Sequence, residues 1–386
     1  MTEIGKVARG GPLDGLRVIE MGGIGPGPFA AMLLADMGAD VIRVDRPGRV
    51  ADERTTAADV LQRGRRSIVL DLRCEEAVEA LRHLVDRAGV LIEGFRPGVM
   101  ERLGLGPAQC HVSNPRLVYG RMTGWGQDGP WATMAGHDVN YIALAGALHP
   151  LGRQGEPPAV PVNLLGDFGA GSLYLVAGVL AALWEAGRSG RGQVVDAAIV
   201  DGAASLTTML HGMLATGGWR DERGVNLLDT GRPWYDVYET ADGGWMSVGA
   251  LEVKFYAEFA ARLGLPDDLV RRPGPNEWPR LRAAIADSFR RRTRAEWETV
   301  FEGTDACVAP VLGLKEVAEH PHLRARQTFV EIQGVRQPAP APRFDRTPGA
   351  VQSPPARRGQ HTAEVLTEWQ VPAVRDLLAS GAAIQD

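Results

Sequence analysis

The sequence predicts an α/β protein with a large domain built on a parallel sheet and a second, smaller α+β domain. Short apolar segments alternate with helical patterns through the first half of the chain. After a glycine-rich, turn-like segment at 217–233, the pattern changes to the alternation that is typical of antiparallel strands. Because alternating strands and helices favour a parallel sheet covered by helices, we assign that architecture to the first half. The length of 386 residues fits two or three domains.

The first strand–helix–strand unit sets the pattern for the large domain. Residues 16–20 form an apolar strand, 21–28 a glycine-rich turn, and 29–37 a helix that ends at Gly38. Residues 41–44 form the next buried strand. The same pattern predicts a helix at 75–87 and further strands at 67–72, 89–93 and 117–121. Residues 166–186 read as a long helix, apolar on nearly all sides and therefore buried.

The second half predicts strands at 234–239 and 245–248, joined by a turn at 241–244. Helices are expected at 253–263, 278–291 and 294–301, an extended proline-rich segment at 338–355, and a last helix at 359–368. The expected domain division is a large domain at 1–200, a linker at 201–235, a small α+β domain at 236–312, a linker at 313–335, and a return to the large domain at 336–386.

Composition excludes several functional classes. The net charge of −5 gives no global attraction to nucleic acid or to an anionic membrane. The three cysteines, Cys74, Cys110 and Cys307, have no CxxC spacing, so neither a disulfide scaffold nor a zinc cluster is expected. The N-terminus lacks the apolar region of a signal peptide, and the best uninterrupted apolar stretch, residues 173–184, is shorter than a membrane span. We therefore expect a cytoplasmic protein that binds neither membranes nor nucleic acid.

Common cofactor motifs are absent from the sequence. None of the three lysines lies in a Walker P-loop or in a motif that supports a pyridoxal Schiff base, and there is no G-x-S-x-G elbow. His320 and His322 have no third ligand nearby in the sequence, so no metal site is expected. The segment GPGPFA at 25–30, with Asp45 following, matches a dinucleotide fingerprint. Its two prolines each remove a backbone donor, which favours a tight strand–helix turn over nicotinamide binding.

Three acid–base residues lie in unusual local contexts. His137 follows a glycine that permits close approach of the backbone, although a histidine in such a place is more often structural. Asp167 precedes the long apolar helix, where it acts either as an N-cap or as an acid–base group beside a positive helix end. Glu252 stands where a strand gives way to a helix, and by itself it is a dipole partner.

Several arginines follow strand ends of the large domain. Ligands of parallel α/β sheets bind at the carboxyl ends of the strands, and arginine holds phosphates in a bidentate manner. Arg49, Arg73, Arg96 and Arg102 therefore form a weak signal for a phosphorylated ligand.

Several long motifs that follow one another along the chain identify a family more specifically than any of these short patterns. They include GPLDGLRVIEMGGIGPGPFAAMLLADMGADVIRVDRPG at 11–48, SIVLDLR at 67–73, GFRPGVMERLGLGP at 94–107, GHDVNYIALAG at 136–146, NLLGDFGAGS at 163–172 and YETADGGWMSVGALEVKFY at 238–256. With these motifs the chain resembles the α-methylacyl-CoA racemases within the class III (CaiB/BaiF-type) CoA-transferase superfamily. The resemblance implies a Rossmann-like large domain without a nicotinamide cofactor and an interlocked homodimer. In such dimers the active site lies between the large domain of one subunit and the small domain of the other.

The resemblance also implies roles for individual residues. His137 and Asp167 would be the two acid–base residues and Glu252 the support of the histidine. Coenzyme A, carried as part of the thioester substrate with no tightly bound cofactor, would be contacted by Arg49, Leu70, Asp71, Leu72, Arg73, Gly94, Phe95, Arg96, Arg102, Gly136, Asp138, Asn140 and Tyr141. The expected reaction interconverts (2R)- and (2S)-2-methylacyl-CoA through an enolate, whose oxygen we expect to meet backbone N–H groups near Asp167.

Two points stay open at this level. A CoA-transferase that uses Asp167 as the acyl-accepting nucleophile is the alternative, although transferases typically lack the histidine of the GHD-x-NY motif. Arg232 stands where the family more usually has Ala, so its effect on the substrate entrance and the acyl chain is undetermined, as is the base that serves each enantiomer.

Overall fold

The computed structural model describes residues 10–48 and 51–386 and divides into two compact units. The first holds the described residues of Met1–Ala145 together with Pro161–Leu206 and Arg326–Asp386. The second holds Gly146–Val160 and Thr207–Ala325. Each unit has its own apolar core. The narrower domain bounds expected from the sequence stay a prediction.

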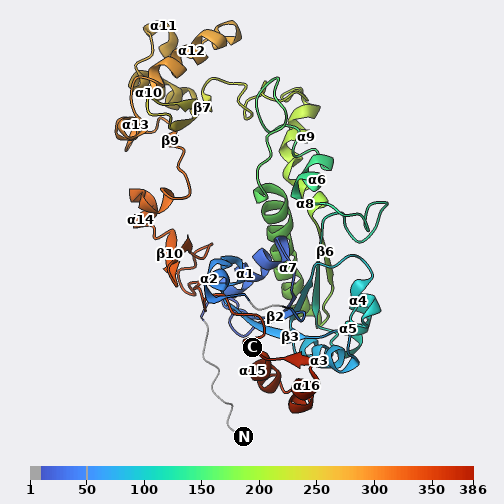
Figure 1. The fold of residues 1–386 in the computed structure, drawn as a ribbon. Coiled ribbons are helices and arrows are strands. Elements are labelled where there is room, and N and C mark those ends of the chain that lie inside the picture. The colour runs from blue at the N-terminus through green and yellow to red at the C-terminus, as the bar shows by residue number, and fades with distance from the viewer. Residues whose placement is uncertain (1–9, 49–50) are drawn as a thin grey trace. The chain divides into compact units, whose positions relative to one another are not determined.

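A seven-stranded sheet forms the centre of the first unit (Figure 1). Its order is β12-β3-β2-β1-β4-β5-β6, and all neighbours are parallel except β12 on β3. The strands are β1 (Arg17–Met21), β2 (Asp40–Asp45), β3 (Arg65–Leu70), β4 (Val90–Glu93), β5 (Val118–Thr123), β6 (Val194–Ala198) and β12 (Ala383–Ile384). The order 3-2-1-4-5-6 is that of doubly wound sheets, so the expected Rossmann-like architecture is confirmed.

Helices cover both faces of this sheet. They are α1 (Pro26–Asp36), α2 (Glu53–Ala58), α3 (Glu75–Val85), α4 (Val99–Arg102), α5 (Pro107–Ser113), α6 (Asp138–Leu144), α7 (Leu173–Ser189), α8 (Ile199–Leu206), α15 (Thr362–Glu368) and α16 (Val374–Ser380). The unit also has a 3-10 helix (Val60–Gln62), a π-helix (Leu164–Ser172) and a hairpin of β10 (Phe329–Ile332) and β11 (Val335–Pro338).

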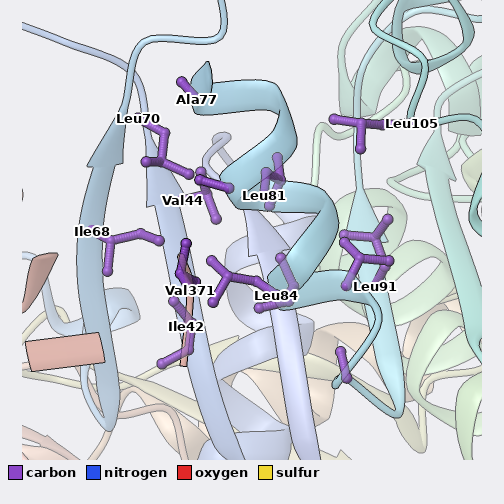
Figure 2. Close-up of a cluster of buried hydrophobic side chains, with 14 of the residues drawn as sticks. Ile42, Val44, Ile68, Leu70, Ala77, Leu81, Leu84, Leu91, Leu105 and Val371 are labelled. Atoms are coloured by element: carbon purple, nitrogen blue, oxygen red, sulfur yellow. The ribbon is translucent and has the colours of Figure 1, made fainter. Parts of the chain in front are cut away.

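The spacing of apolar residues explains how α3 packs. Ala77, Leu81 and Leu84 recur every three to four residues, so they share one helix face, and all three are fully buried. Figure 2 shows this face against Ile42 and Ile68 of neighbouring strands. The same core takes in side chains of α15 and α16, so the C-terminal segment closes over the sheet that the N-terminal segment begins.

The opposite face of the central strands carries charge. Glu20 of β1 and Arg65 of β3 are buried and pair at 2.6 Å. Glu20 Oε1 and the Nε and Nη2 atoms of Arg65 have no hydrogen-bond partner among the described residues. Because a lone buried charge is costly, each of these residues needs the other.

The long apolar helix differs from its expectation. The π-helix Leu164–Ser172 continues directly into α7, which gives 26 helical residues with a mean hydropathy of 1.6 over the most apolar window. The expectation that no apolar segment is long enough to cross a membrane is therefore wrong by length and composition, a criterion that core helices of soluble proteins also meet. The sequence predicts that this helix is buried, but only 39% of the window is buried within the single chain. Leu173 and Trp184 are exposed.

The second unit is the expected α+β domain. The strands β7 (Tyr235–Glu239), β8 (Trp245–Gly249) and β9 (Val308–Pro310) form an antiparallel sheet. The helices are α9 (Thr208–Ala215), α10 (Val253–Leu263), α11 (Asp267–Val270), α12 (Trp278–Phe289), α13 (Arg294–Phe301) and α14 (Pro321–Ala325), with 3-10 turns at Pro275–Glu277 and Val317–Glu319. Stacked and edge-on rings, among them Phe259, Phe289 and Trp297, fill its core.

Candidate active site

The GHD-x-NY motif begins with a close contact at Gly136. A Cβ atom here would lie 2.7 Å from the ring of Tyr141 and 3.0 Å from that of Trp125. The two rings meet edge to face, with centroids 4.7 Å apart, and the Tyr141 hydroxyl donates a hydrogen bond to the Gly136 carbonyl. Only glycine fits in this space, so the packing fixes the backbone immediately before His137.

His137 is the N-cap of α6. Its backbone is extended (φ −134°, ψ 172°), and its N–H donates to Asn140 Oδ1 at 3.0 Å. The residue is exposed although its backbone is anchored. A fixed backbone below an accessible imidazole suits a group that exchanges protons with a ligand.

Asp138, the next residue, connects α6 to the second acid–base residue. Its Oδ1 accepts a hydrogen bond from the backbone N–H of Asp167 at 2.5 Å. The residue is 6% exposed, and a Cβ atom at Gly166 would collide with Oδ1. The glycine before Asp167 therefore makes room for this contact.

Asp167 lies in the π-helical turn, half-buried. Such turns are rare and occur often at functional sites. Gly25, at the start of α1, faces the carboxylate so closely that a Cβ atom there would lie 3.2 Å from Asp167 Oδ2. Phe168 stacks on Phe29 with centroids 4.4 Å apart. The glycine-rich turn of the first unit therefore borders this carboxylate.

Burial and charge act together on the Asp167 carboxyl. Burial raises its pKa most, and the neighbouring Asp138 carboxylate raises it further. A hydrogen bond from Asn163 and the charge of His137 lower it by less, so the net shift of the pKa is upward. The structure thus brings His137 and Asp167 within electrostatic reach of each other, with Asp138 between them in the chain and in space.

The sequence predicts that backbone N–H groups near Asp167 meet the enolate oxygen, and this stays a prediction. Of these groups, the N–H of Asp167 itself donates to Asp138 Oδ1. The amide of Asp167 is thus part of the scaffold of the site, and an oxyanion has to find its donors at other amides.

Glu252 lies in the second unit, as the N-cap of α10 rather than in the first turn. Its carboxylate is exposed and has no hydrogen-bond partner in the described part of the chain. The turn before it is held by Arg272, whose Nη2 donates to the carbonyls of Ala250 and Leu251 at 3.1 and 2.7 Å. The guanidinium lies over two aromatic rings, those of Trp234 at 4.5 Å and Tyr256 at 5.1 Å. Sequence reasoning missed Arg272, which has no local motif.

Eight of the residues assigned to coenzyme A form two groups, one with contacts inside the protein and one exposed. Leu70 is buried, and Leu72 and Phe95 pack against the core below the sheet. Arg73 and Asp71 pair with each other at 2.6 Å. A second group consists of exposed residues after β4, namely Gly94, Arg96 and Arg102.

The free cations are the most suitable of these residues for a phosphorylated ligand. No ion pair of Arg96 or Arg102 is found among residues 10–48 and 51–386, whereas Arg73 already has a carboxylate partner. Arg49 lies outside the described residues. Asp138, Asn140 and Tyr141 each have a positioning contact of their own, so any contact with coenzyme A would be an addition to it.

The nicotinamide alternative finds little support in the geometry. Asp45, the carboxylate that would bind a ribose, accepts hydrogen bonds from Arg43 and from Ser67, both at 2.7 Å. Pro26 lies at the first position of α1, where its missing N–H costs nothing. The segment is a tight strand–helix turn, as its prolines predict. Among the described residues, no group of three His, Cys, Asp or Glu side chains is placed to hold a metal ion.

Arg232 is turned into the second unit. Its guanidinium lies 4.3 Å from the ring centroid of Trp278, and Nη1 donates to the carbonyl of Val225 at 2.9 Å. Within its own unit, the side chain therefore organises the loop before β7.

Comparisons with known proteins identify the family of the chain. The model of CoA-transferase family III matches residues 13–362. The chain is 46% identical to the alpha-methylacyl-CoA racemases of Mus musculus, over 363 residues, and of Homo sapiens, over 364 residues, and in both cases 92% of this chain and 93% of the relative are covered. A crystal structure of a CAIB/BAIF family protein from Brucella suis superposes with a TM-score of 0.80 at 26% identity, covering 93% of this chain and 100% of that one. The chain belongs to CoA-transferase family III.

Proposed function

We propose that this protein is a racemase that interconverts (2R)- and (2S)-2-methylacyl-CoA thioesters. The observation that carries the proposal is the pairing of an exposed imidazole, His137, with a half-buried carboxyl, Asp167, through the Asp138 contact. Two different acid–base groups side by side suit removal of a proton from one face of a carbon and its return to the other. The racemase names of the mouse and human relatives support the same activity.

In this mechanism one group acts as base and the other as acid. The base takes the α-hydrogen as a proton, and the electron pair of the C–H bond moves into the thioester carbonyl to form an enolate. The conjugate acid on the opposite face then donates its proton to the α-carbon, and the carbonyl reforms. Neutral His137 serves as base for one epimer and ionised Asp167 for the other.

The raised pKa of Asp167 has a function here. An ordinary aspartate, with a pKa near 3.9, is a poor proton donor at neutral pH, whereas imidazole titrates near 6.5. Burial and the Asp138 charge move the pKa of Asp167 toward that of imidazole. The upward shift of the Asp167 pKa favours the protonated form that the return step requires of this residue.

The CoA moiety is proposed to lie at the carboxyl ends of β3 and β4. Arg96 and Arg102 are exposed there, and guanidinium groups bind phosphates by paired hydrogen bonds. The thioester itself brings the coenzyme, so no resident cofactor enters the reaction.

The active enzyme is proposed to be an interlocked homodimer in which Glu252 of one subunit supports His137 of the other. In the first unit, elements that pack together carry exposed apolar side chains, and these support the proposal. The side chains are Leu144 of α6, Leu164 and Leu173 of the long helix, and Leu206 of α8. Contiguous exposed apolar surface marks an interaction site. We propose a cytoplasmic location, which cell fractionation tests.

The test is ¹H NMR of a racemic 2-methylacyl-CoA incubated with the enzyme in D₂O. We expect loss of the α-proton signal and collapse of the 2-methyl doublet, and His137→Ala should nearly abolish exchange while CoA-ester binding stays measurable. Absence of exchange with several acyl chains would overturn the proposal. Hydroxylamine trapping of an acyl-enzyme at Asp167, with transfer of CoA to an added acid, would then establish the transferase alternative.

A further inference from the structure

We propose that Asp138 is a positioning residue that joins the two acid–base residues into one rigid pair. This inference deepens the proposed function and rests on it. The residue follows His137 in the chain, and its carboxylate binds the backbone of Asp167. A single side chain therefore connects the N-cap that presents the imidazole to the π-helical turn that presents the carboxyl.

The geometry leaves Asp138 little freedom for another role. The residue is 6% exposed, so little of its side chain is accessible to a ligand in the described unit. Its Oδ1 is used by the Asp167 amide, and its Oδ2 is buried without a hydrogen-bond partner among the described residues. Burial of a carboxylate with one oxygen unsatisfied is unfavourable for folding. A neutral acceptor would hold the same amide at a lower cost.

The charge has a consequence at Asp167 that a neutral acceptor would not have. The titratable groups that act on Asp167 are Asp138 and His137, and Tyr141 is the further titratable side chain that senses it. All three lie in α6 or at its N-cap. Of the two that act on Asp167, Asp138 raises its pKa and His137 lowers it. After burial, the Asp138 carboxylate is therefore the next largest influence that opposes ionisation of Asp167 and favours its protonated form.

Gly166 supports the same interpretation independently. Its hydrogen atom faces Asp138 Oδ1, and any side chain at this position would push the carboxylate away. The chain thus has glycine at the point where the two segments have to approach each other most closely.

The experiment compares Asp138→Asn and Asp138→Ala with the parent enzyme. Asparagine keeps an acceptor for the Asp167 amide and removes the charge, whereas alanine removes both. The readouts are the Kd of a 2-methylacyl-CoA and the rate of α-proton exchange in D₂O as a function of pH, starting from each pure enantiomer. Circular dichroism of each variant checks that it is folded. Asp86→Asn is the matched control, because Asp86 is a surface carboxylate that accepts a hydrogen bond from Ser113.

For Asp138→Asn we expect an unchanged Kd and a displaced pH profile. In the direction in which Asp167 is the base, the rate falls as the pH drops through the pKa of Asp167, and this limb should move to lower pH. Asp138→Ala should in addition lose roughly 10²-fold in exchange rate in both directions, the effect of a misplacement near 1 Å. Asp86→Asn should match the parent.

Three outcomes would overturn the inference. Unchanged pH profiles and rates in both Asp138 variants would show that the contact has no functional role. A weaker Kd with an unchanged profile would make Asp138 a ligand contact, as the family resemblance implies. A rate lost equally in both variants without a shift of the limb would make the role purely structural. Failure of the parent enzyme to exchange the α-proton would instead remove the proposed function itself, so the two failures are distinguishable.

Discussion

Two carboxylates assigned to the same reaction are held in opposite ways. Asp167 is half-buried in a π-helical turn, its amide bound by Asp138 and its carboxyl bordered by Gly25. Glu252 is exposed at a strand–helix turn, and its side chain makes no hydrogen bond or ion pair among the described residues, although its charge interacts with that of Arg272. The protein fixes the side chain of the first residue and only the backbone of the second.

The difference suggests where each carboxylate acquires its properties. The pKa of Asp167 is already raised within its own unit, by burial and by a neighbouring charge. Glu252 is exposed on a turn whose backbone carbonyls accept hydrogen bonds from Arg272. A carboxyl whose pKa is set within its own unit suits a group that exchanges protons with the substrate. An exposed carboxylate suits a group that makes its contacts outside its own unit.

The largest expected effect is on α-proton exchange in Asp167→Asn. Removing a placed acid–base group typically costs roughly 10²–10⁴-fold in rate. Glu252→Gln should cost less, because an amide retains an acceptor for the imidazole that Glu252 is proposed to support. Exchange rates from NMR in D₂O, measured for both variants at saturating substrate, test this order. Equal losses of exchange rate in the two variants would show that the two carboxylates contribute equally to the reaction.

Next in size is the effect of Gly166→Ala. The new Cβ atom would collide with Asp138 Oδ1, so either Asp138 or the π-helical turn has to move. A shift of about 1 Å at the reacting groups is expected to lower exchange by roughly 10²-fold.

Gly187→Ala is the matched control for this substitution. Gly187 lies in α7, and a Cβ atom there meets no other atom within 4 Å. Alanine should stabilise that helix by roughly 0.5–1 kcal/mol and leave exchange unaltered. Exchange in Gly166→Ala equal to that of the control would show that the site tolerates loss of the close approach.

Arg272→Ala tests how the Glu252 turn is held. The substitution leaves two carbonyls without their charged donor and removes the cation from two aromatic faces. Hydrogen bonds to charged groups contribute about 1.5–3 kcal/mol, so the free energy of unfolding should fall by about that amount. Urea denaturation followed by tryptophan fluorescence measures it.

Two further variants sharpen this measurement. Arg272→Lys should recover part of the loss, because an ammonium still donates hydrogen bonds but lacks the planar guanidinium. Arg271→Ala, at the exposed neighbouring position, should change the unfolding free energy by less than about 0.5 kcal/mol. Equal stabilities of Arg272→Ala and Arg271→Ala would mean that the turn does not depend on the hydrogen bonds from Arg272.

Much of the fold could be predicted because local signals and burial agree. The helices at 253–263 and 294–301 have the predicted bounds. The second begins with Thr293, whose side chain accepts from the Glu296 amide, a capping box visible in the sequence. Strands β1 to β5 are short buried runs bounded by turn residues, and their predicted ends differ from the observed ends by at most two residues.

Other elements depend on contacts that the sequence does not display. Strand β12 has two residues and exists through its pairing with β3, more than 300 residues earlier in the chain. Strand β6 is exposed at its start, so it lacks the apolar run that marks a buried strand. The π-helix Leu164–Ser172 has the composition of an ordinary helix, so its wider turns could not be predicted from the sequence.

The site also has residues that the sequence indicates and residues whose roles depend on long-range contacts. His137 and Asp167 stand out by their glycine-flanked motifs, and the structure brings them together. Asp138 was assigned to coenzyme A because it belongs to the same motif, and its contact with the Asp167 amide joins segments 29 residues apart. Arg272 lies 22 and 21 residues after Ala250 and Leu251, whose carbonyls it binds, with no sequence pattern linking them. Long-range side-chain-to-backbone bonds of this kind have no periodicity from which they could be predicted.

The smallest expected effect concerns the stability of Asp167→Asn. In the folded protein the pKa of Asp167 lies above its unfolded value, because burial and Asp138 both disfavour the ionised form. A raised carboxyl pKa means that the folded state binds this proton more tightly, so the group stabilises the fold below the unfolded pKa, about 3.9, and that contribution is lost as the pH rises through the folded pKa. Asparagine removes this loss.

The variant should therefore have a higher free energy of unfolding than the parent at pH 7, and the difference should shrink as the pH falls toward 4. Urea denaturation of both proteins across this range measures it, with Asp86→Asn as a control for the chemical change at a surface site. A variant less stable than the parent at pH 7, by an amount independent of pH, would show that the Asp167 carboxylate stabilises the fold when ionised. In that case the half-buried position would not be a source of its proton affinity, and the contrast with Glu252 would rest on geometry alone.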